Sequence, residues 1–227
     1  MNNINADNKI YFLSDFHLGA HNYAASLIRE KKLVHFLDSI KHKAAAIFIV
    51  GDIFDFWFEY KKSIPKGYTR LLGKLAEISD AGIPIVVFTG NHDMWMSGYF
   101  EEELNITVYH EPQTFVWNNK KILIGHGDGL GPGDHGYKLL KKVFTNPICK
   151  WLFRILHPDW GIGLANYFSR KSKEKTGVSD DHFLGEDQEW LIVYCKEVLK
   201  KEYFDFLIFG HRHYPIDFPL SGESRLS

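Results

Sequence analysis

Cysteine is scarce in this sequence, and neither sign of charge prevails. The two cysteines, Cys149 and Cys195, lie far apart and form no CxxC pair, which is typical of free thiols in a reducing cytoplasm rather than of a disulfide framework. The formal net charge is -1 at pH 7, so the chain as a whole has no bias toward nucleic acid. We therefore expect no nucleic-acid partner.

Long hydrophobic runs are also absent. No stretch reaches the ~18 apolar residues of a membrane span, and the polar start MNNINADNKI lacks the apolar region of a secretion signal. No internal repeat, low-complexity tract or linker interrupts the chain. We predict a single domain, residues 1–227, that is cytoplasmic and has no obligate protein partner.

Short apolar runs alternate with segments of helical periodicity. Residues 27–40 and 71–78 repeat Leu, Ile or Val at helical spacing between the first three of these runs, and a hairpin within residues 106–124 is expected to turn at Asn118-Asn119. This order predicts an α/β fold, a layered sandwich of mixed sheets flanked by helices. The runs that predict buried strands are Ile10–Leu13, Ala44–Val50, Ile83–Phe88, Ile122–Ile124 and Phe204–Phe209.

One segment differs from the rest in both charge and hydropathy. Tyr137 to Lys175 contains nine Lys or Arg residues and two acidic ones, together with more Leu, Ile, Trp and Phe than a connector needs. We interpret it as two or three helices that form a cap inserted at about residues 130–178. The alternative is that its apolar side chains merely pack on the sheet while its lysines form a solvated face.

Each predicted strand is followed by a polar cluster. Ligands of open α/β sheets bind beyond the carboxyl ends of the strands, so five such clusters can converge on one site. A glycine before the polar residue allows the sharp turn that aims the next side chain across the sheet edge. The clusters are Asp15-Phe16-His17, Gly51-Asp52-Ile53-Phe54-Asp55, Gly90-Asn91-His92-Asp93, Gly125-His126-Gly127-Asp128 and Gly210-His211-Arg212-His213.

These clusters offer carboxylate, imidazole and amide groups but no thiolate. Such a set suits Mn²⁺, Fe or Zn²⁺ rather than a Cys-rich structural zinc or an all-oxygen calcium site. Alone, each cluster has an ordinary explanation, such as a helix N-cap, a turn or a pair of surface histidines. Their repetition after every strand favours a site with two divalent metal ions, an arrangement that catalyses displacement at phosphorus.

In type and order, the clusters resemble the motifs of the calcineurin-like metallophosphoesterases. The resemblance implies that Asp52 bridges two metals, and that His92 stabilises charge or protonates the leaving oxygen while Asp93 orients its ring. Asn91, His92 and Asp93 are thus the candidate catalytic residues. The resemblance assigns one metal to Asp15, His17, Asp52 and His213, and the other to Asp52, Asn91, His126 and His211.

A narrower resemblance is to the UDP-2,3-diacylglucosamine pyrophosphatases of lipid A biosynthesis. It comprises Leu-Ser-Asp-Phe-His-Leu-Gly, Gly-Asp-Ile-Phe-Asp-Phe-Trp, the Asp-His-Gly-Tyr run at residues 134–137 and the apolar, basic insertion. It implies a nucleotide-lipid substrate, acyl chains held by the cap through residues such as Trp151, Phe153 and Leu156, and peripheral contact with the inner face of a membrane. The substrate-contact candidates are Asn91, His92, Asp134, Tyr137, Arg170, Ser172, Lys173 and His211.

Two departures and two alternatives accompany this resemblance. Some members of that narrower family carry Arg where this chain has His92, and the chain ends soon after His213. The first alternative is a phosphoesterase acting on another phosphodiester or nucleotide pyrophosphate. The second is a non-catalytic scaffold of the same fold, although none of the seven expected ligands is missing.

Overall fold

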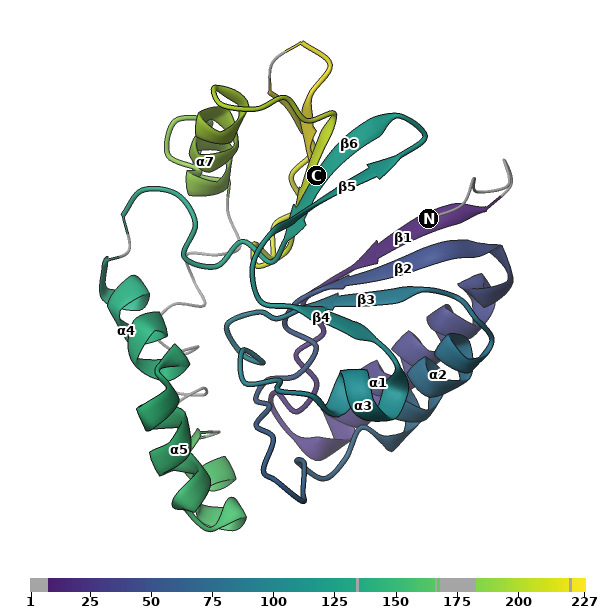
Figure 1. Cartoon of the computed structure of the whole chain (residues 1–227), viewed down its shortest axis with the longest axis vertical. Helices are drawn as coiled ribbons and strands as arrows, with labels where there is room; N and C mark the ends of the chain where they lie inside the picture. The colour runs from purple at the N-terminus through teal and green to yellow at the C-terminus, as the bar shows by residue number, and fades with distance from the viewer. Residues whose placement is uncertain (1–7, 134, 166, 168–182, 221) are drawn as a thin grey trace.

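Two β-sheets stack face to face in the computed structural model, with helices on their outer faces (Figure 1). The structure describes residues 8–133, 135–165, 167, 183–220 and 222–227. The first sheet is parallel, in the order β1-β2-β3-β4. Its strands are β1 (Lys9–Leu13), β2 (Ala44–Val50), β3 (Ile85–Phe88) and β4 (Thr107–Tyr109).

The second sheet is mixed, with strand order β5-β6-β7-β9-β8. Only β5 with β6 and β8 with β9 pair in the antiparallel sense, while β6, β7 and β9 run parallel. The strands are β5 (Gln113–Trp117), β6 (Lys120–Gly125), β7 (Phe206–Phe209), β8 (Phe218–Pro219) and β9 (Arg225–Leu226).

Alternation along the strands builds a core on each face. Ile47 and Ile49 of β2 point outward to the helices, whereas Phe48 and Val50 point inward and pack with Trp117 and neighbours from the second sheet. The outer layer of the first sheet comprises α1 (Tyr23–Ile40), the short 3₁₀ turn η1 (Lys41–Lys43), α2 (Thr69–Asp80) and α3 (Tyr99–Leu104). On the second sheet, α7 (Trp190–Leu199) packs against Leu123 and Leu207.

Local capping places the helices that flank the site. The Asn22 side chain accepts the Ala25 N–H and begins α1, and buried Glu30 on α1 accepts the N–H groups of Arg70 and Leu71 at the start of α2. One helix therefore caps the next.

A pair of consecutive helices, α4 (His135–Thr145) and α5 (Pro147–Ile155), stands beside the sandwich (Figure 1). The Asn146 side chain accepts the Ile148 N–H and starts α5, and residues 158–165 are also helical. The expected helices of the cap are therefore present. In the described part of the chain, no helix combines the length and apolarity needed to cross a membrane.

The predicted α/β sandwich is confirmed, with corrections at two places. Within residues 106–124 the hairpin involves only β5 and β6, because β4 pairs in parallel with β3 of the other sheet. The predicted turn at Asn118 and Asn119 is correct, and both residues have the positive φ that a tight hairpin turn requires. The strands expected from Ile83 and Phe204 begin two residues later, at Ile85 and Phe206.

Candidate metal centre

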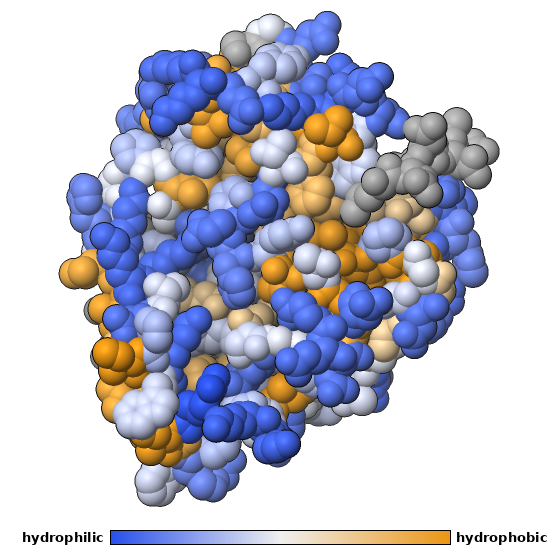
Figure 2. All heavy atoms as spheres, viewed as in Figure 1, coloured by the Kyte–Doolittle hydropathy of each residue, from blue (hydrophilic) through white to orange (hydrophobic). Residues whose placement is uncertain are grey.

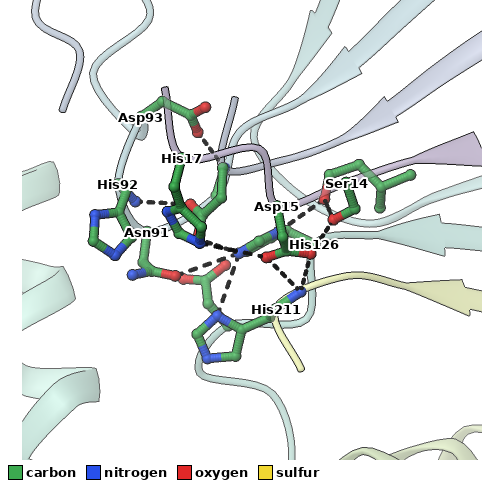
Figure 3. A network of polar contacts seen from close by, with 12 residues as sticks. Ser14, Asp15, His17, Asn91, His92, Asp93, His126 and His211 are labelled. Atoms are coloured by element: carbon green, nitrogen blue, oxygen red, sulfur yellow. Dashed lines mark hydrogen bonds and ion pairs between the residues drawn. The ribbon is translucent and has the colours of Figure 1, made fainter. Parts of the chain in front are cut away.

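The carboxyl ends of five strands from both sheets meet at one edge of the sandwich. There the first sheet contributes the loops after β1, β2 and β3, and the second contributes those after β6 and β7. Figure 3 shows the side chains from these loops converging on one another. The structure brings together all seven predicted ligands, Asp15, His17, Asp52, Asn91, His126, His211 and His213.

The backbone is bent sharply to achieve this convergence. Asp15, His17, Asp52 and His211 all have positive φ, a conformation that non-glycine residues adopt at a cost. The loops after β1 and β2 brace each other, because the N–H groups of Asp15 and His17 donate to the carbonyls of Gly51 and Asp52. The strain is thus held by the surrounding chain.

A glycine is required where two of these loops touch. A Cβ on Gly90 would lie 2.1 Å from Asp52 Oδ1 and 2.7 Å from the Asp52 backbone nitrogen. Such an atom would collide with backbone as well as side chain. The glycine of the Gly-Asn-His-Asp cluster therefore allows the β3 loop to approach Asp52.

Three acceptor atoms face one another around His126. Its Nδ1–H donates to the Val50 carbonyl at 2.8 Å, which in the neutral ring leaves a lone pair on Nε2. That Nε2 lies 3.4 Å from Asp52 Oδ2 and 3.3 Å from Asn91 Oδ1, with His211 Nδ1 also 3.3 Å away. Such a set of acceptors needs either a proton or a cation among them.

A second group lies on the other side of Asp52. His17 Nε2 and His213 Nε2 are 3.1 Å apart, and each is within 4.0 Å of Asp15 Oδ1. Asp52 Oδ2 is 3.7 Å from His17 Nε2 and 3.4 Å from His126 Nε2. The Asp52 carboxylate therefore stands between the two groups, as a bridging ligand would.

The donor set and its spacing fit divalent metal ions. Ligand atoms about 2.0–2.2 Å from one ion lie roughly 3–3.5 Å from each other, close to the separations found around His126. Mixed imidazole, carboxylate and amide donors suit first-row transition metals. The residues present thus fit the metal centre that the sequence predicts.

The electrostatics of the protein alone also favour a cation here. Burial alone would lower the pKa of His126, but the negative charges of Asp52, Asp15 and Asp128 outweigh it and raise that pKa to about 10. Burial, with the charge of His126, lowers the pKa of His211 to about 4. The His126 ring therefore holds a proton, and the positive charge of that proton takes the place that a metal ion would occupy.

His92 lies at the edge of the cluster, where its ring centroid is 4.8 Å from that of His17 (Figure 3). Its Nδ1–H donates to the backbone carbonyl of Asp55 at 2.8 Å, and its backbone N–H donates to Asp52 Oδ1 at 3.0 Å. The first bond keeps a proton on Nδ1 and leaves Nε2 to a substrate, to which it can donate when the ring carries a second proton. The side chain is therefore placed as a proton donor or charge stabiliser would be.

The expectation that Asp93 orients the His92 ring is wrong. The Asp93 carboxylate accepts the N–H groups of Gly90 and Ile53, both at 2.7 Å, and ties the β2 loop to the β3 loop. Burial, with a contribution from the charge of Asp52, raises the pKa of Asp93 to about 7. Asp93 therefore has a structural position, and the ring of His92 is oriented by Asp55.

Asp55 is the site residue that sequence reasoning left without a role. Its buried carboxylate oxygen Oδ1 lies 3.9 Å from His17 Nδ1 and 3.7 Å from His92 Nδ1. A carboxylate behind a metal-binding imidazole fixes the ring and raises its basicity. The signal was present in the sequence as the second aspartate of Gly-Asp-x-x-Asp.

Comparison with known proteins agrees with this geometry. The model of the family described as calcineurin-like phosphoesterase matches residues 8–215. The chain belongs to this family. The phosphoesterase is thus a metal-dependent hydrolase, as predicted, and its divalent ions require ligands of the kind gathered at the strand ends.

Individual relatives of the phosphoesterase have one name in common. A UDP-2,3-diacylglucosamine hydrolase from Porphyromonas gingivalis is 40% identical, over 96% of this chain and 88% of that protein. Proteins with the same name from Edwardsiella ictaluri and Pseudomonas aeruginosa are each 26% identical, over 90% and 93% of this chain and 75% and 84% of their own lengths. The predicted resemblance is confirmed by these matches.

Polar contacts with Asp128 connect the α4 helix of the phosphoesterase to the loop that carries His126. The Tyr137 hydroxyl donates to Asp128 Oδ2 at 2.5 Å, and Lys141 Nζ lies 2.8 Å from the same oxygen. Asp128 follows His126 in the β6 loop, so the start of α4 is held next to a predicted ligand. Tyr137 therefore lies near the site, whereas the other candidates Asp134, Arg170, Ser172 and Lys173 fall outside the described residues.

Aromatic packing holds α5 against the same loops. The Phe153 ring lies 4.7 Å from that of Phe58 and 4.9 Å from that of Trp95, and the Trp95 indole N–H donates to the Phe144 carbonyl at 2.7 Å. Phe58 and Trp95 follow the Asp52 and Asn91 clusters in the sequence. Phe153 therefore packs against the body of the phosphoesterase, and the expectation that it lines an acyl groove together with Trp151 stays a prediction.

The remaining apolar side chains of α4 and α5 are exposed. Neither helix has a fully buried residue, and Figure 2 shows apolar surface along the side of the molecule where they lie. The exposed large apolar residues of this segment are Leu139, Leu140, Val143, Phe144, Ile148, Trp151, Leu152, Ile155, Leu156, Trp160, Leu164 and Tyr167, and we call them the cap face.

Proposed function

We propose that this phosphoesterase hydrolyses the pyrophosphate bond of UDP-2,3-diacylglucosamine to give UMP and 2,3-diacylglucosamine 1-phosphate. The observation that carries the proposal is the exposed cap face on α4 and α5. Tyr137 and Phe153 attach these two helices to the loops of the candidate metal centre. A substrate with a phosphate at one end and two acyl chains at the other needs both surfaces. The names of the relatives support the same substrate.

The proposed cofactor is a pair of Mn²⁺ ions, with Fe or Zn²⁺ as alternatives. Bound metals would activate the attacking water and neutralise charge on the phosphoryl oxygens. Asp52 would be shared between the ions. Asp15, His17 and His213 would complete one coordination sphere, and Asn91, His126 and His211 the other.

The remaining steps belong to the protein. The Asp55 carbonyl holds the Nδ1–H of His92, and the doubly protonated ring gives its Nε2 proton to the leaving oxygen, or a hydrogen bond to the phosphoryl group. Asn91 orients the phosphoryl group at the shared edge of the two sheets. Asp93 keeps the β2 and β3 loops in register, so that His92 and Asp52 stay at a fixed separation.

Contacts with the rest of the substrate are assigned to two regions. Asn91, His92, His211 and Tyr137 lie at or near the metal centre and would contact the phosphates. The resemblance adds Asp134, Arg170, Ser172 and Lys173, which belong to the basic part of the cap. The acyl chains would lie on the cap face, where each CH₂ removed from water contributes about 0.8 kcal/mol.

We also propose that the protein works in the cytoplasm, as a peripheral protein on the inner face of the membrane. A diacylated substrate partitions into a bilayer, and the exposed apolar and basic residues of the cap suit an anionic membrane surface. No partner other than substrate and membrane is required by this proposal.

The test is release of UMP by the purified protein loaded with Mn²⁺. We expect UMP from UDP-2,3-diacylglucosamine and little or none from UDP-N-acetylglucosamine, which has the same diphosphate but no long chains. Asp52→Ala serves as the inactive control. Equal turnover of both compounds would contradict the lipid substrate and favour a phosphoesterase for soluble nucleotides, and no turnover of any phosphoester would favour a scaffold.

A further inference from the structure

A buried ion pair lies behind the last ligand loop. Arg212 stands between His211 and His213 in the sequence, and its guanidinium is buried against the carboxylate of Glu189, which is also buried. Arg212 Nε is 3.0 Å from Glu189 Oε1, and the Nη2–H donates to Oε2 at 3.2 Å. The Nη2–Oε2 pair is thus a hydrogen bond, and the Nε–Oε1 pair is a close contact between the two opposite charges.

Stability alone is a weak reason for this pair. A buried ion pair is often no more stable than apolar residues of the same volume, because both charges must leave water. Apolar alternatives would be well accommodated here, since Leu191 and Leu226 are buried at the same hollow. The pair therefore contributes something that apolar residues cannot, namely a directional constraint.

The loop that carries the pair is strained and needs such a constraint. His211 has φ +69, and a non-glycine residue keeps this conformation only when its surroundings impose it. On the site side, the His211 N–H donates to the Asp15 carboxylate at 3.0 Å. On the opposite side, Arg212 is fastened to Glu189, the residue immediately before α7.

We propose that Arg212 and Glu189 are positioning residues for both metal ions. Holding Arg212 fixes the direction of the residues on either side of it, so that His211 Nδ1 faces His126 and His213 Nε2 faces His17. These two histidines belong to different groups of predicted ligands. One anchor therefore sets the geometry of both groups, and α7 adds the Trp190 ring beside His211.

The inference rests on the metal ligands of the proposed function but not on its lipid substrate. It is tested by Mn²⁺ affinity, measured by titration without substrate, together with the metal-free Tm. The main variant is the double change Glu189→Met and Arg212→Met, which removes both charges and keeps the volume. We expect a metal-free Tm close to that of the wild type and Mn²⁺ binding weaker by about 10–100-fold, the usual cost of losing a group that orients a ligand.

Two further variants make the test decisive. Arg212→Lys keeps the charge but not the planar fork, and we expect it to restore part of the Mn²⁺ affinity. The matched control is Arg225→Met with Asp217→Met, an exposed ion pair with contacts at 3.0 and 2.8 Å in which neither residue is next to a predicted ligand in the sequence. We expect that control to bind Mn²⁺ as the wild type does.

Wild-type Mn²⁺ affinity in a folded Glu189→Met/Arg212→Met protein would overturn the proposal. A lower Tm with unchanged affinity of the folded fraction would also overturn it, because the pair would then serve stability alone. If the double variant does not fold, Arg212→Lys decides in the same way. A different outcome is possible, in which the protein releases no UMP but its Mn²⁺ affinity still depends on Arg212. That outcome would contradict only the proposed substrate and would leave the role of Arg212 and Glu189 standing.

Discussion

The strand ends and the cap use apolar residues in opposite ways. Trp57 and Trp117, in the body of the protein, are 0% and 7% exposed, whereas Trp151 and Trp160 of the cap face are 60% and 76% exposed. Trp57 stacks on Phe54 of the loop that carries Asp52, and Trp117 packs between the two sheets at the turn end of the β5–β6 hairpin. The second pair has solvent on one side, and such a surface beside a catalytic centre is typical of a binding site for an apolar ligand.

This difference suggests that the residues at the strand ends carry out the reaction, whereas the cap face selects the substrate. Most groups of the candidate metal centre are buried or partly buried and contact one another, so a single substitution there should abolish all activity. The cap face makes few contacts with the rest of the protein, so a substitution there should affect only substrates that reach it. Variants in the two regions therefore test the comparison directly.

The largest effect is expected for Asp52→Ala. The carboxylate stands between both groups of ligands, so its loss should remove metal from both. We expect turnover of every substrate to fall by more than about 10³-fold, since losing a metal removes more charge stabilisation than losing one hydrogen-bond donor, which costs about 10²–10³-fold. Metal analysis of the purified variant checks this, and one retained equivalent of metal would mean that Asp52 is not shared.

His92→Ala should have the next largest effect and should spare the metals. Its ring is held by the Asp55 carbonyl rather than by the ligand groups, so only a proton transfer or a hydrogen bond to substrate is lost. We expect kcat to fall by about 10²–10³-fold, as for a missing general acid. Full metal content in the same preparation is part of the prediction, and loss of metal would place His92 among the ligands.

A matched pair on α5 separates the two uses of an aromatic side chain. Trp151→Ala removes exposed surface, and losing contact with two or three acyl CH₂ groups costs about 2 kcal/mol, or roughly 30-fold in kcat/KM for the diacylated substrate. Hydrolysis of a small chromogenic phosphodiester should stay within about twofold.

Phe153→Ala should instead impair both substrates and lower the Tm, because Phe153 packs against Phe58 and Trp95 beneath the helix. If both variants behave alike on both substrates, the cap is a single structural support, and the distinction between its two faces is wrong.

The smallest effects are expected for single cations of the cap. Changing Arg170, Lys171 or Lys173 singly to Gln should weaken association with anionic vesicles about fivefold at low salt, because a cation near such a surface contributes about 1 kcal/mol. Raising the ionic strength should erase this difference but leave the effect of Trp151→Ala. Equal binding by wild type and variants at low salt would remove these residues from the membrane surface.

Much of the fold was predictable because its strands are continuously apolar. The predicted Ala44–Val50 strand matches β2 to the residue, since an all-buried strand between two layers leaves no ambiguity. β4 was missed because it has only three residues, none of them fully buried, and the same local pattern also suits one arm of a hairpin. Its membership of the first sheet depends on long-range pairing with β3, which local sequence does not encode.

The sequence was enough to predict which residues converge at the candidate site, but not which contacts they make with one another. Five polar clusters at strand ends must meet when the strands do, so the convergence of the seven ligands follows from topology. The partner of the His92 ring does not follow, because it is a backbone carbonyl at Asp55 brought close by a turn. The division between Trp151 and Phe153 likewise depends on which side of α5 faces the body of the protein.

The site is shared between distant parts of the chain, and this has a consequence during synthesis. On the ribosome, Asp15, Asp52 and Asn91 are made early, whereas His211 and His213 follow Asn91 by roughly 6–24 s at about 5–20 residues per second. The first sheet can form in that interval, but β7 and its loop are still missing from the second. The nascent chain therefore passes through a stage with four of its seven predicted metal ligands, and we expect hydrolytic activity only when the last of them is in place.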